Sequence, residues 1–161
     1  MIENEQELKE IMEIALRKLY EKDRELIDRI LHENAINHKL AIYLEEAINL
    51  QKEWISTYSI DVEYNKDGNN AKKLNGDKEF RPDIILHERN SNERNILLIE
   101  AKKEKLIDKD KNTLKECLKA PFNYRFSVGI EYKNPNQKES FICYIRTKEN
   151  PDEMVLFEII K

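Results

Sequence analysis

The order of apolar patterns along the chain predicts an α/β fold with a mixed central sheet. Helical periodicity occupies the first third of the 161 residues, strand-like runs dominate the rest, and one helical segment interrupts those runs. That order favours a sheet that contains both parallel and antiparallel neighbours. With 40% hydrophobic residues the chain can bury a sizeable core, so we expect a single domain over residues 1–161.

Helical segments are expected first along the chain. No proline occurs before Pro82, so no proline breaks them. We interpret residues 1–32 as an N-terminal helical extension and residues 33–161 as the core of the domain. Apolar residues recur at helical spacing in three successive segments, 4–21, about 23–32 and about 33–51.

Strand patterns begin at Trp54, where β-branched and aromatic residues alternate with polar ones up to Tyr64. Residues 65–79 are rich in Asn, Lys and Asp, and they predict a polar loop. The later elements are expected as strand, strand, helix and three further strands, at about 82–87, 95–101, 108–119, 124–132, 140–147 and 153–160.

Composition narrows the classes of function. The net charge of −4 argues against a basic protein that coats nucleic acid, but a nuclease needs only a local basic patch. Cys117 and Cys143 belong to no metal-binding or redox motif, so we expect partly buried free thiols in a reducing compartment. The N-terminus is acidic, and no run of 18 apolar residues occurs. We therefore expect a soluble cytoplasmic protein without a signal peptide or a membrane span.

Charged residues flank two successive strand-like runs. Pro82-Asp83 opens the run Pro-Asp-Ile-Ile-Leu, and Glu100-Ala101-Lys102 closes the run Asn-Ile-Leu-Leu-Ile-Glu-Ala-Lys. In a hairpin centred between Ser91 and Asn92, positions whose numbers add up to 183 face each other, so Asp83 lies opposite Glu100. Directly opposed like charges destabilise a strand pair, which favours a cation between them. A register shift of one residue would break this arrangement.

These residue types suit a Mg²⁺ or Mn²⁺ site. Mg²⁺ prefers hard oxygen ligands and takes one or two carboxylates, which Asp83 and Glu100 supply, and the carbonyl of Ala101 adds a third ligand. Lys102 would orient or activate the attacking water and stabilise a pentavalent phosphate. Pro-Asp recurs at 151–152 in a predicted turn, so the strand context gives the motif its meaning. The other interpretation is a solvated, charged hairpin end.

Two further glutamates each have two interpretations. Glu33 falls within the inward stripe of the third predicted helix, from which it could reach the metal or Lys102. If that helix begins after residue 33, Glu33 is instead an exposed N-terminal acid favoured by the helix dipole. Glu63 lies on the polar face of the first predicted strand, as an additional metal ligand or as an ordinary edge charge.

Other polar and aromatic residues have less specific interpretations. His38 is expected on the surface of its helix. His87 shares the predicted face of Asp83, where it is either a phosphate contact or, as we favour, a histidine at a loop edge. Tyr124, Phe126 and Tyr132 are expected in the core or the sheet. A basic run follows the candidate site, as a solvated face or as a contact to a DNA backbone: Lys103, Lys105, Lys109 and Lys111.

The motif resembles that of the PD-(D/E)XK nuclease superfamily. The flanking sequence looks like a poorly characterised bacterial branch of that superfamily, and the resemblance spans roughly residues 30–132. The segments that carry it are 37–45, 61–65, 81–87 and 95–103, in that order.

The resemblance implies a restriction-endonuclease-like αβββαβ core whose central sheet carries the site. It implies Asp83 and Glu100 as metal ligands, Lys102 as the catalytic lysine and an assisting glutamate on the preceding helix, for which Glu33 is the best match. The expected protein is a Mg²⁺-dependent (or Mn²⁺-dependent) nuclease that hydrolyses phosphodiester bonds, with DNA as its partner and a homodimer as one possible assembly. The alternatives are a catalytically inactive member that serves as a binding or interaction module, and a small structural or regulatory α/β protein.

Overall fold

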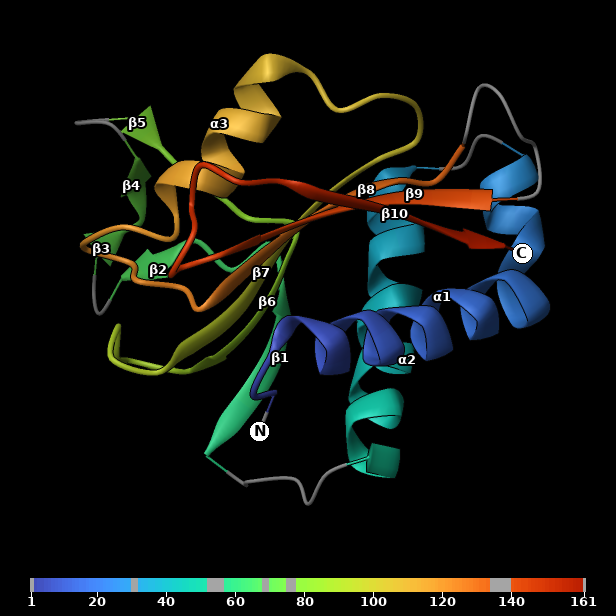
Figure 1. The fold of residues 1–161 in the computed structure, drawn as a ribbon, viewed down its shortest axis with the longest axis horizontal. Helices are drawn as coiled ribbons and strands as arrows, with labels where there is room; N and C mark the ends of the chain where they lie inside the picture. The colour runs from blue at the N-terminus through green and yellow to red at the C-terminus, as the bar shows by residue number, and fades with distance from the viewer. Residues whose placement is uncertain are drawn as a thin grey trace.

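A six-stranded mixed sheet organises the protein, for which a computed structural model describes residues 2–29, 32–51, 57–67, 70–74, 78–133 and 140–160 (Figure 1). Strands β7 (Asn95–Lys102) and β8 (Phe126–Glu131) are parallel and are connected through helix α3 (Asp108–Glu116), whereas all other neighbours in this sheet are antiparallel. The expected mixed α/β class is therefore confirmed. In spatial order the strands are β1 (Tyr58–Val62), β6 (Ile84–Glu88), β7 (Asn95–Lys102), β8 (Phe126–Glu131), β9 (Ser140–Thr147) and β10 (Val155–Ile160).

Two long helices precede the sheet. Helix α1 (Glu5–Asp28) begins after Asn4, whose side chain accepts a hydrogen bond from the N–H of Glu7 at 2.9 Å. Asp23 has non-helical backbone angles (φ −129°, ψ 27°), so α1 consists of two helical segments joined across a kink where the helices expected over 4–21 and about 23–32 meet. Helix α2 (Glu33–Gln51) has the predicted bounds.

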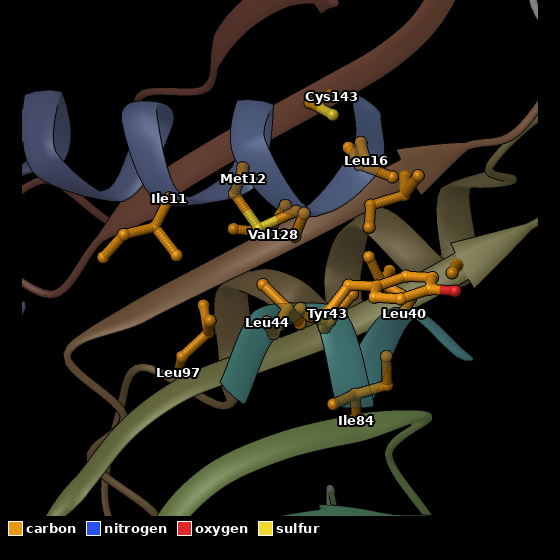
Figure 2. Packing of buried hydrophobic residues seen from close by; sticks show 14 of the residues in the cluster. Ile11, Met12, Leu16, Leu40, Tyr43, Leu44, Ile84, Leu97, Val128 and Cys143 are labelled. Atoms are coloured by element: carbon orange, nitrogen blue, oxygen red, sulfur yellow. The ribbon is translucent and has the colours of Figure 1, made fainter. Parts of the chain in front are cut away.

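The N-terminal helices are integral to the core. Side chains of α1 and α2 pack with Ile84, Leu97 and Val128 of the sheet in one hydrophobic cluster (Figure 2). On the opposite face, α3 and the segment after it cover Ile85 and Leu98. Helix α1 thus covers the sheet together with α2.

Helix α3 lies close to the sheet because β8 carries a glycine at the contact. A Cβ atom at Gly129 would lie 2.5 Å from Cδ1 of Leu106 and 2.8 Å from Cδ1 of Leu114. Cys117 and Cys143 are both buried free thiols, as expected. No helix in the described ranges is long and apolar enough to cross a membrane.

The loop prediction for residues 65–79 is wrong in part. This segment contains four two-residue strands that pair as two small antiparallel ladders, and the patterns are too short to recognise in the sequence. Lys72 anchors the segment: it is 1% exposed, and its Nζ donates to the hydroxyl of Tyr124 at 2.8 Å. The strand expected from Trp54 begins at Tyr58, and residues 52–56 lie outside the described part. The short strands are β2 (Lys66–Asp67), β3 (Asn70–Ala71), β4 (Lys73–Leu74) and β5 (Lys78–Glu79).

The predicted hairpin register is confirmed over the part of the ladder nearest the motif. Ile84 faces Ile99, Ile85 faces Leu98 and Leu86 faces Leu97, and each pair of numbers adds up to 183. A bulge between Leu86 and His87 shifts only the far end of the hairpin. Asp83 lies directly before β6, one position beyond the paired residues. The sequence therefore predicted the pairing that brings Asp83 to the end of β7.

Candidate metal centre

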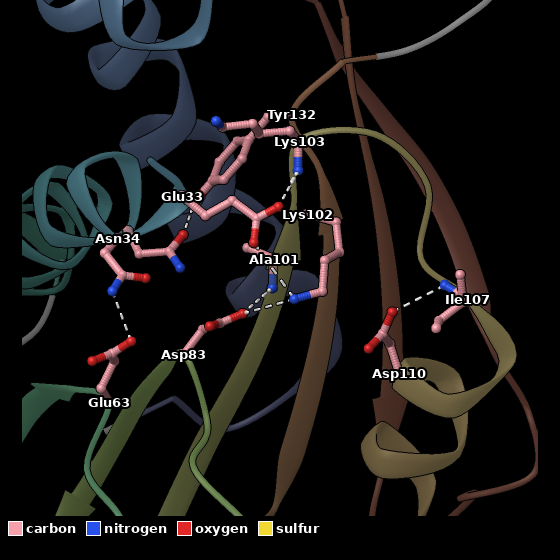
Figure 3. Close-up of polar contacts among 11 residues, drawn as sticks. Glu33, Asn34, Glu63, Asp83, Ala101, Lys102, Lys103, Ile107, Asp110 and Tyr132 are labelled. Atoms are coloured by element: carbon pink, nitrogen blue, oxygen red, sulfur yellow. Dashed lines mark hydrogen bonds and ion pairs between the residues drawn. The ribbon is translucent and has the colours of Figure 1, made fainter. Parts of the chain in front are cut away.

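The predicted motif converges where β6 begins and β7 ends (Figure 3). Oδ2 of Asp83 accepts a hydrogen bond from the N–H of Ala101 at 2.8 Å, so the carboxylate is fixed across the hairpin. The side chain of Asp83 is 15% exposed. Burial raises the pKa of Asp83, although the Ala101 N–H and the charge of Lys102 act in the opposite direction. A further positive charge near Asp83 therefore stabilises the ionised form of its carboxyl group.

Lys102 joins the hairpin to the first turn of α2. Its Nζ lies 3.6 Å from Oε2 of Glu33 and 4.0 Å from Oδ2 of Asp83, and Oε1 of Glu33 accepts from the N–H of Lys103 at 3.1 Å. Burial lowers the pKa of Lys102, but the charges of the surrounding carboxylates outweigh it and raise the pKa above its ordinary value. Lys102 is therefore a protonated ammonium near neutral pH. Glu33 reaches Lys102, as one of its two interpretations has it, and α2 begins at Glu33 itself rather than after it.

Glu100 is the most unusual group of the site. Its side chain is 7% exposed, and Oε1 has no hydrogen-bond partner within the described residues. Burial, followed by the negative charge of Asp83, raises the pKa of Glu100 to about 8. A buried, unpaired carboxylate is costly unless a cation or a proton neutralises it. The position thus fits a divalent cation held jointly with Asp83.

The donor set matches the chemistry of Mg²⁺ better than that of Zn²⁺. Among the described residues, no group of three or more His, Cys, Asp or Glu side chains is arranged to hold a metal ion. Mg²⁺ takes one or two carboxylates and completes its octahedral shell with waters and phosphate oxygens, whereas a structural Zn²⁺ site needs four protein ligands. Two carboxylates and a backbone carbonyl suit Mg²⁺ or Mn²⁺.

Glu63 lies beside this centre but has partners of its own. Its Oε1 accepts from Nδ2 of Asn34 at 2.8 Å, and its Oε2 lies 3.5 Å from Nη1 of Arg81 (Figure 3). The charge of Glu63 nevertheless contributes to the raised pKa of Asp83. These contacts match the interpretation of Glu63 as an edge charge more closely than that of a direct ligand.

A buried polar pair behind the centre was not recognised from the sequence. The hydroxyl of Tyr132 donates to Oδ1 of Asn37 at 2.7 Å, and both side chains are fully buried. The N–H of Tyr132 donates to the carbonyl of Lys102 at 2.9 Å. Asn37 lies one helical turn after Glu33, so the spacing of the two residues was the available signal.

The predicted position of His87 at a loop edge is wrong. His87 lies within β6, is 2% exposed, and has its Nε2 2.9 Å from Oδ2 of Asp61. Its ring packs edge-on against Tyr64 with the centroids 4.7 Å apart. The bidentate pair between Asp61 and Arg89 extends this cluster at the end of β6 away from Asp83, so His87 is no part of the candidate centre. His38 is exposed, as expected.

No protein-family model, curated protein or solved structure matches the chain. The arrangement of Asp83, Glu100, Lys102 and Glu33 must therefore be interpreted from its own chemistry.

Proposed function

We propose that the protein is a Mg²⁺-dependent or Mn²⁺-dependent nuclease of the PD-(D/E)XK type that hydrolyses phosphodiester bonds, with DNA as the expected substrate. One observation carries the proposal: within the described residues the buried Oε1 of Glu100 has no hydrogen-bond partner, while the charge of Asp83 acts on Glu100 and the ammonium of Lys102 lies within ion-pair distance of Asp83. Two carboxylates and a cationic side chain are the groups that metal-assisted attack on a phosphate requires.

The element order supports the same proposal. Apart from the short strands of residues 66–79, the chain from α2 to β8 runs helix, three strands, helix, strand. This is the αβββαβ succession that the sequence resemblance implies. The second and third of these strands form the hairpin that carries the motif.

Each residue has a defined part in the proposed reaction. Asp83, Glu100 and the carbonyl of Ala101 hold the cation, which when bound would polarise the phosphate and lower the pKa of a bound water. Lys102 is protonated, so it stabilises negative charge that develops on the phosphate and orients the water by donation. Glu33 positions Lys102 through their ion pair. Water attacks the phosphorus directly and releases a proton to solvent, while the P–O bond to the leaving sugar oxygen breaks and that oxygen takes up a proton from solvent, so no covalent intermediate with the protein forms.

The direct test is cleavage of plasmid, linear, single-stranded and branched DNA with Mg²⁺ or Mn²⁺. Asp83→Ala and Lys102→Ala should each lower the rate by at least about 100-fold, and removal of the metal with EDTA should abolish cleavage. Asp152→Ala is a matched control, because it alters the other Pro-Asp pair of the chain, where the exposed Asp152 contacts Lys115. Activity that survives Asp83→Ala would assign the cleavage to a contaminant or to another site.

A second candidate function is a binding module without catalysis. The favouring observation is that carboxylates of Glu33 and Asp83 both lie within ion-pair distance of Lys102 and so balance its charge. This candidate predicts that the protein binds DNA or a protein partner but cleaves none of the four substrates, even at high protein concentration. Cleavage that depends on Asp83 would exclude it.

A further inference from the structure

A lysine-rich segment leads from the end of β7 into α3. Residues 102–111 contain five lysines and three acidic residues, although the whole chain has a net charge of −4. The segment begins at the candidate centre, because the N–H of Lys103, the residue directly after Lys102, donates to Oε1 of Glu33 at 3.1 Å (Figure 3). Positive charge is therefore concentrated in the connection between the centre and α3.

Hydrogen bonds fix the backbone of this connection. Leu106 is 4% exposed, and its N–H donates at 3.0 Å to Oε1 of Glu131, a buried residue at the end of β8. The N–H of Ile107 donates to Oδ2 of Asp110 in the first turn of α3 at 3.0 Å. The backbone is thus held in place before a ligand arrives, which reduces the entropy that binding costs.

The lysines of the segment differ in what their ammonium groups contact. Nζ of Lys111 lies 5.8 Å from the ring centroid of Tyr144. By contrast, the ammonium groups of Lys103, Lys105 and Lys109 form no ion pair or hydrogen bond among the described residues, and the last two side chains are exposed. We call these three lysines the basic rim, and their charges are available to an anionic partner.

Two further observations connect the basic rim to a nucleic acid strand at the centre. Burial and the charge of Asp83 raise the pKa of Glu100, whereas the charge of Lys109 acts in the opposite direction and therefore reaches the centre. Ile107 follows Lys105 by two residues and is 60% exposed. Lysines neutralise phosphates, and an exposed apolar side chain between them can pack against a nucleotide.

We propose that the basic rim and Ile107 hold the sugar-phosphate backbone of the strand whose scissile phosphate meets the candidate centre. The ammonium groups neutralise phosphates next to the scissile one, and Ile107 packs against a sugar between them. Such contacts give affinity and position without reading base sequence. The inference rests on the proposed function, and it decides between the solvated face and the DNA contact for Lys103, Lys105 and Lys109.

The salt dependence of DNA binding tests this role, because it counts phosphate contacts. The probe is a labelled duplex of about 20 base pairs in EDTA, whose anisotropy is followed between about 50 and 200 mM salt. The slope of log affinity against log salt should become shallower by about 0.9 in Lys105→Ala and again in Lys109→Ala. Ile107→Ala should weaken binding and leave the slope unchanged, since it removes no charge. Lys22→Ala is the matched control, because Lys22 is exposed on α1 and has no ion pair among the described residues, and it should bind like the wild type.

The outcomes distinguish the basic rim from the proposed function. Lys105→Arg keeps the charge and should retain the wild-type slope, which a loss of folding would not allow. Wild-type slopes in both alanine variants, together with cleavage that depends on Asp83, would overturn the role of the rim and leave the nuclease intact. Shallower slopes in a protein that cuts none of the DNA substrates would support the rim and overturn the nuclease. A wild-type protein that neither binds nor cuts DNA would overturn both.

Discussion

Glu100 is the residue whose environment departs furthest from that of an ordinary surface carboxylate. Its pKa is raised to about 8 by burial and by Asp83, so the folded protein without metal binds a proton there more tightly than the unfolded chain does. The tighter proton binding stabilises the folded protein fully at pH values below the pKa that Glu100 has in the unfolded chain. This stabilisation is lost as the pH rises through the pKa that Glu100 has in the folded protein. Binding of a divalent cation requires the ionised form, so it opposes that loss.

We expect the free energy of unfolding of the metal-free wild-type protein to fall as the pH rises from 5 to 8. The linkage between proton binding and folding makes this loss on the order of a few kcal/mol. Glu100→Gln keeps the shape of the side chain and removes the titration, so its stability should change less over this range and should exceed that of the wild type at pH 8. Urea unfolding at both pH values measures the difference. Glu104→Gln, at an exposed position, is the control and should retain the wild-type slope.

A comparison of the wild type with Glu100→Gln also distinguishes metal binding at the centre from general effects of ions. At pH 8, Mg²⁺ should raise the unfolding midpoint of the wild type by mass action, and it should raise that of Glu100→Gln much less. Equal stabilisation of the two proteins would contradict the assignment of Glu100 as a ligand.

Helix α2 is the element that connects the centre to the rest of the molecule. Its first turn carries Glu33, and its second carries Asn37, which accepts from the buried hydroxyl of Tyr132 at the end of β8. Because the backbone N–H of Tyr132 also donates to the carbonyl of Lys102, this one residue, which directly follows β8, contacts both β7 and α2. The orientation of Glu33 thus depends on a contact that lies outside the motif.

Tyr132→Phe should destabilise the protein by about 1–3 kcal/mol, because it leaves the buried Oδ1 of Asn37 without its donor. The double variant Tyr132→Phe with Asn37→Leu removes both polar groups and should recover part of that loss. Thermal unfolding of the two single variants and the double variant forms a double-mutant cycle. Strictly additive effects would show that the hydroxyl and the amide are not coupled.

Across the whole molecule, the sequence predicted the elements with clear periodicity and missed those that depend on distant contacts. The bounds of α2 and the pairing of β6 with β7 followed from local patterns and one register argument, whereas the approach of Glu33 to Lys102 was one of two interpretations that the sequence left open. The four short strands of residues 66–79 did not, because two-residue ladders carry too few side chains to show alternation. The burial of His87 also escaped prediction, since it depends on partners from β1 and from the segment that contains Tyr64.

The contribution of the N-terminal region to the hydrophobic core depends on packing contacts that the sequence does not show. The apolar side chains of α1 belong to the same cluster as those of α2 and the sheet. Six of its seven buried residues are Leu, Ile or Met, and their burial contributes roughly 9–18 kcal/mol by hydrophobic transfer. That amount is comparable to the whole net stability of a typical domain, about 5–15 kcal/mol.

A chain shortened to residues 33–161 should therefore fail to fold cooperatively. Circular dichroism during thermal unfolding should show no sigmoidal transition, and sedimentation should show aggregation. Glu13→Ala, an exposed change within α1, should leave the transition of the full chain almost unchanged. A cooperative transition in the shortened chain would establish residues 1–32 as a separable extension.

Contact between α1 and the last strand also governs the timing of folding during synthesis. Nζ of Lys9 in α1 lies 5.8 Å from the ring centroid of Phe157 in β10. Helix α1 can pair with α2 soon after both emerge from the ribosome, but β10 is translated roughly 130 residues after α1 ends. At about 5–20 residues per second, the face of α1 that meets β10 waits for roughly 6–25 s before its partner exists. That face of α1 is therefore accessible to chaperones and proteases until β10 has been translated.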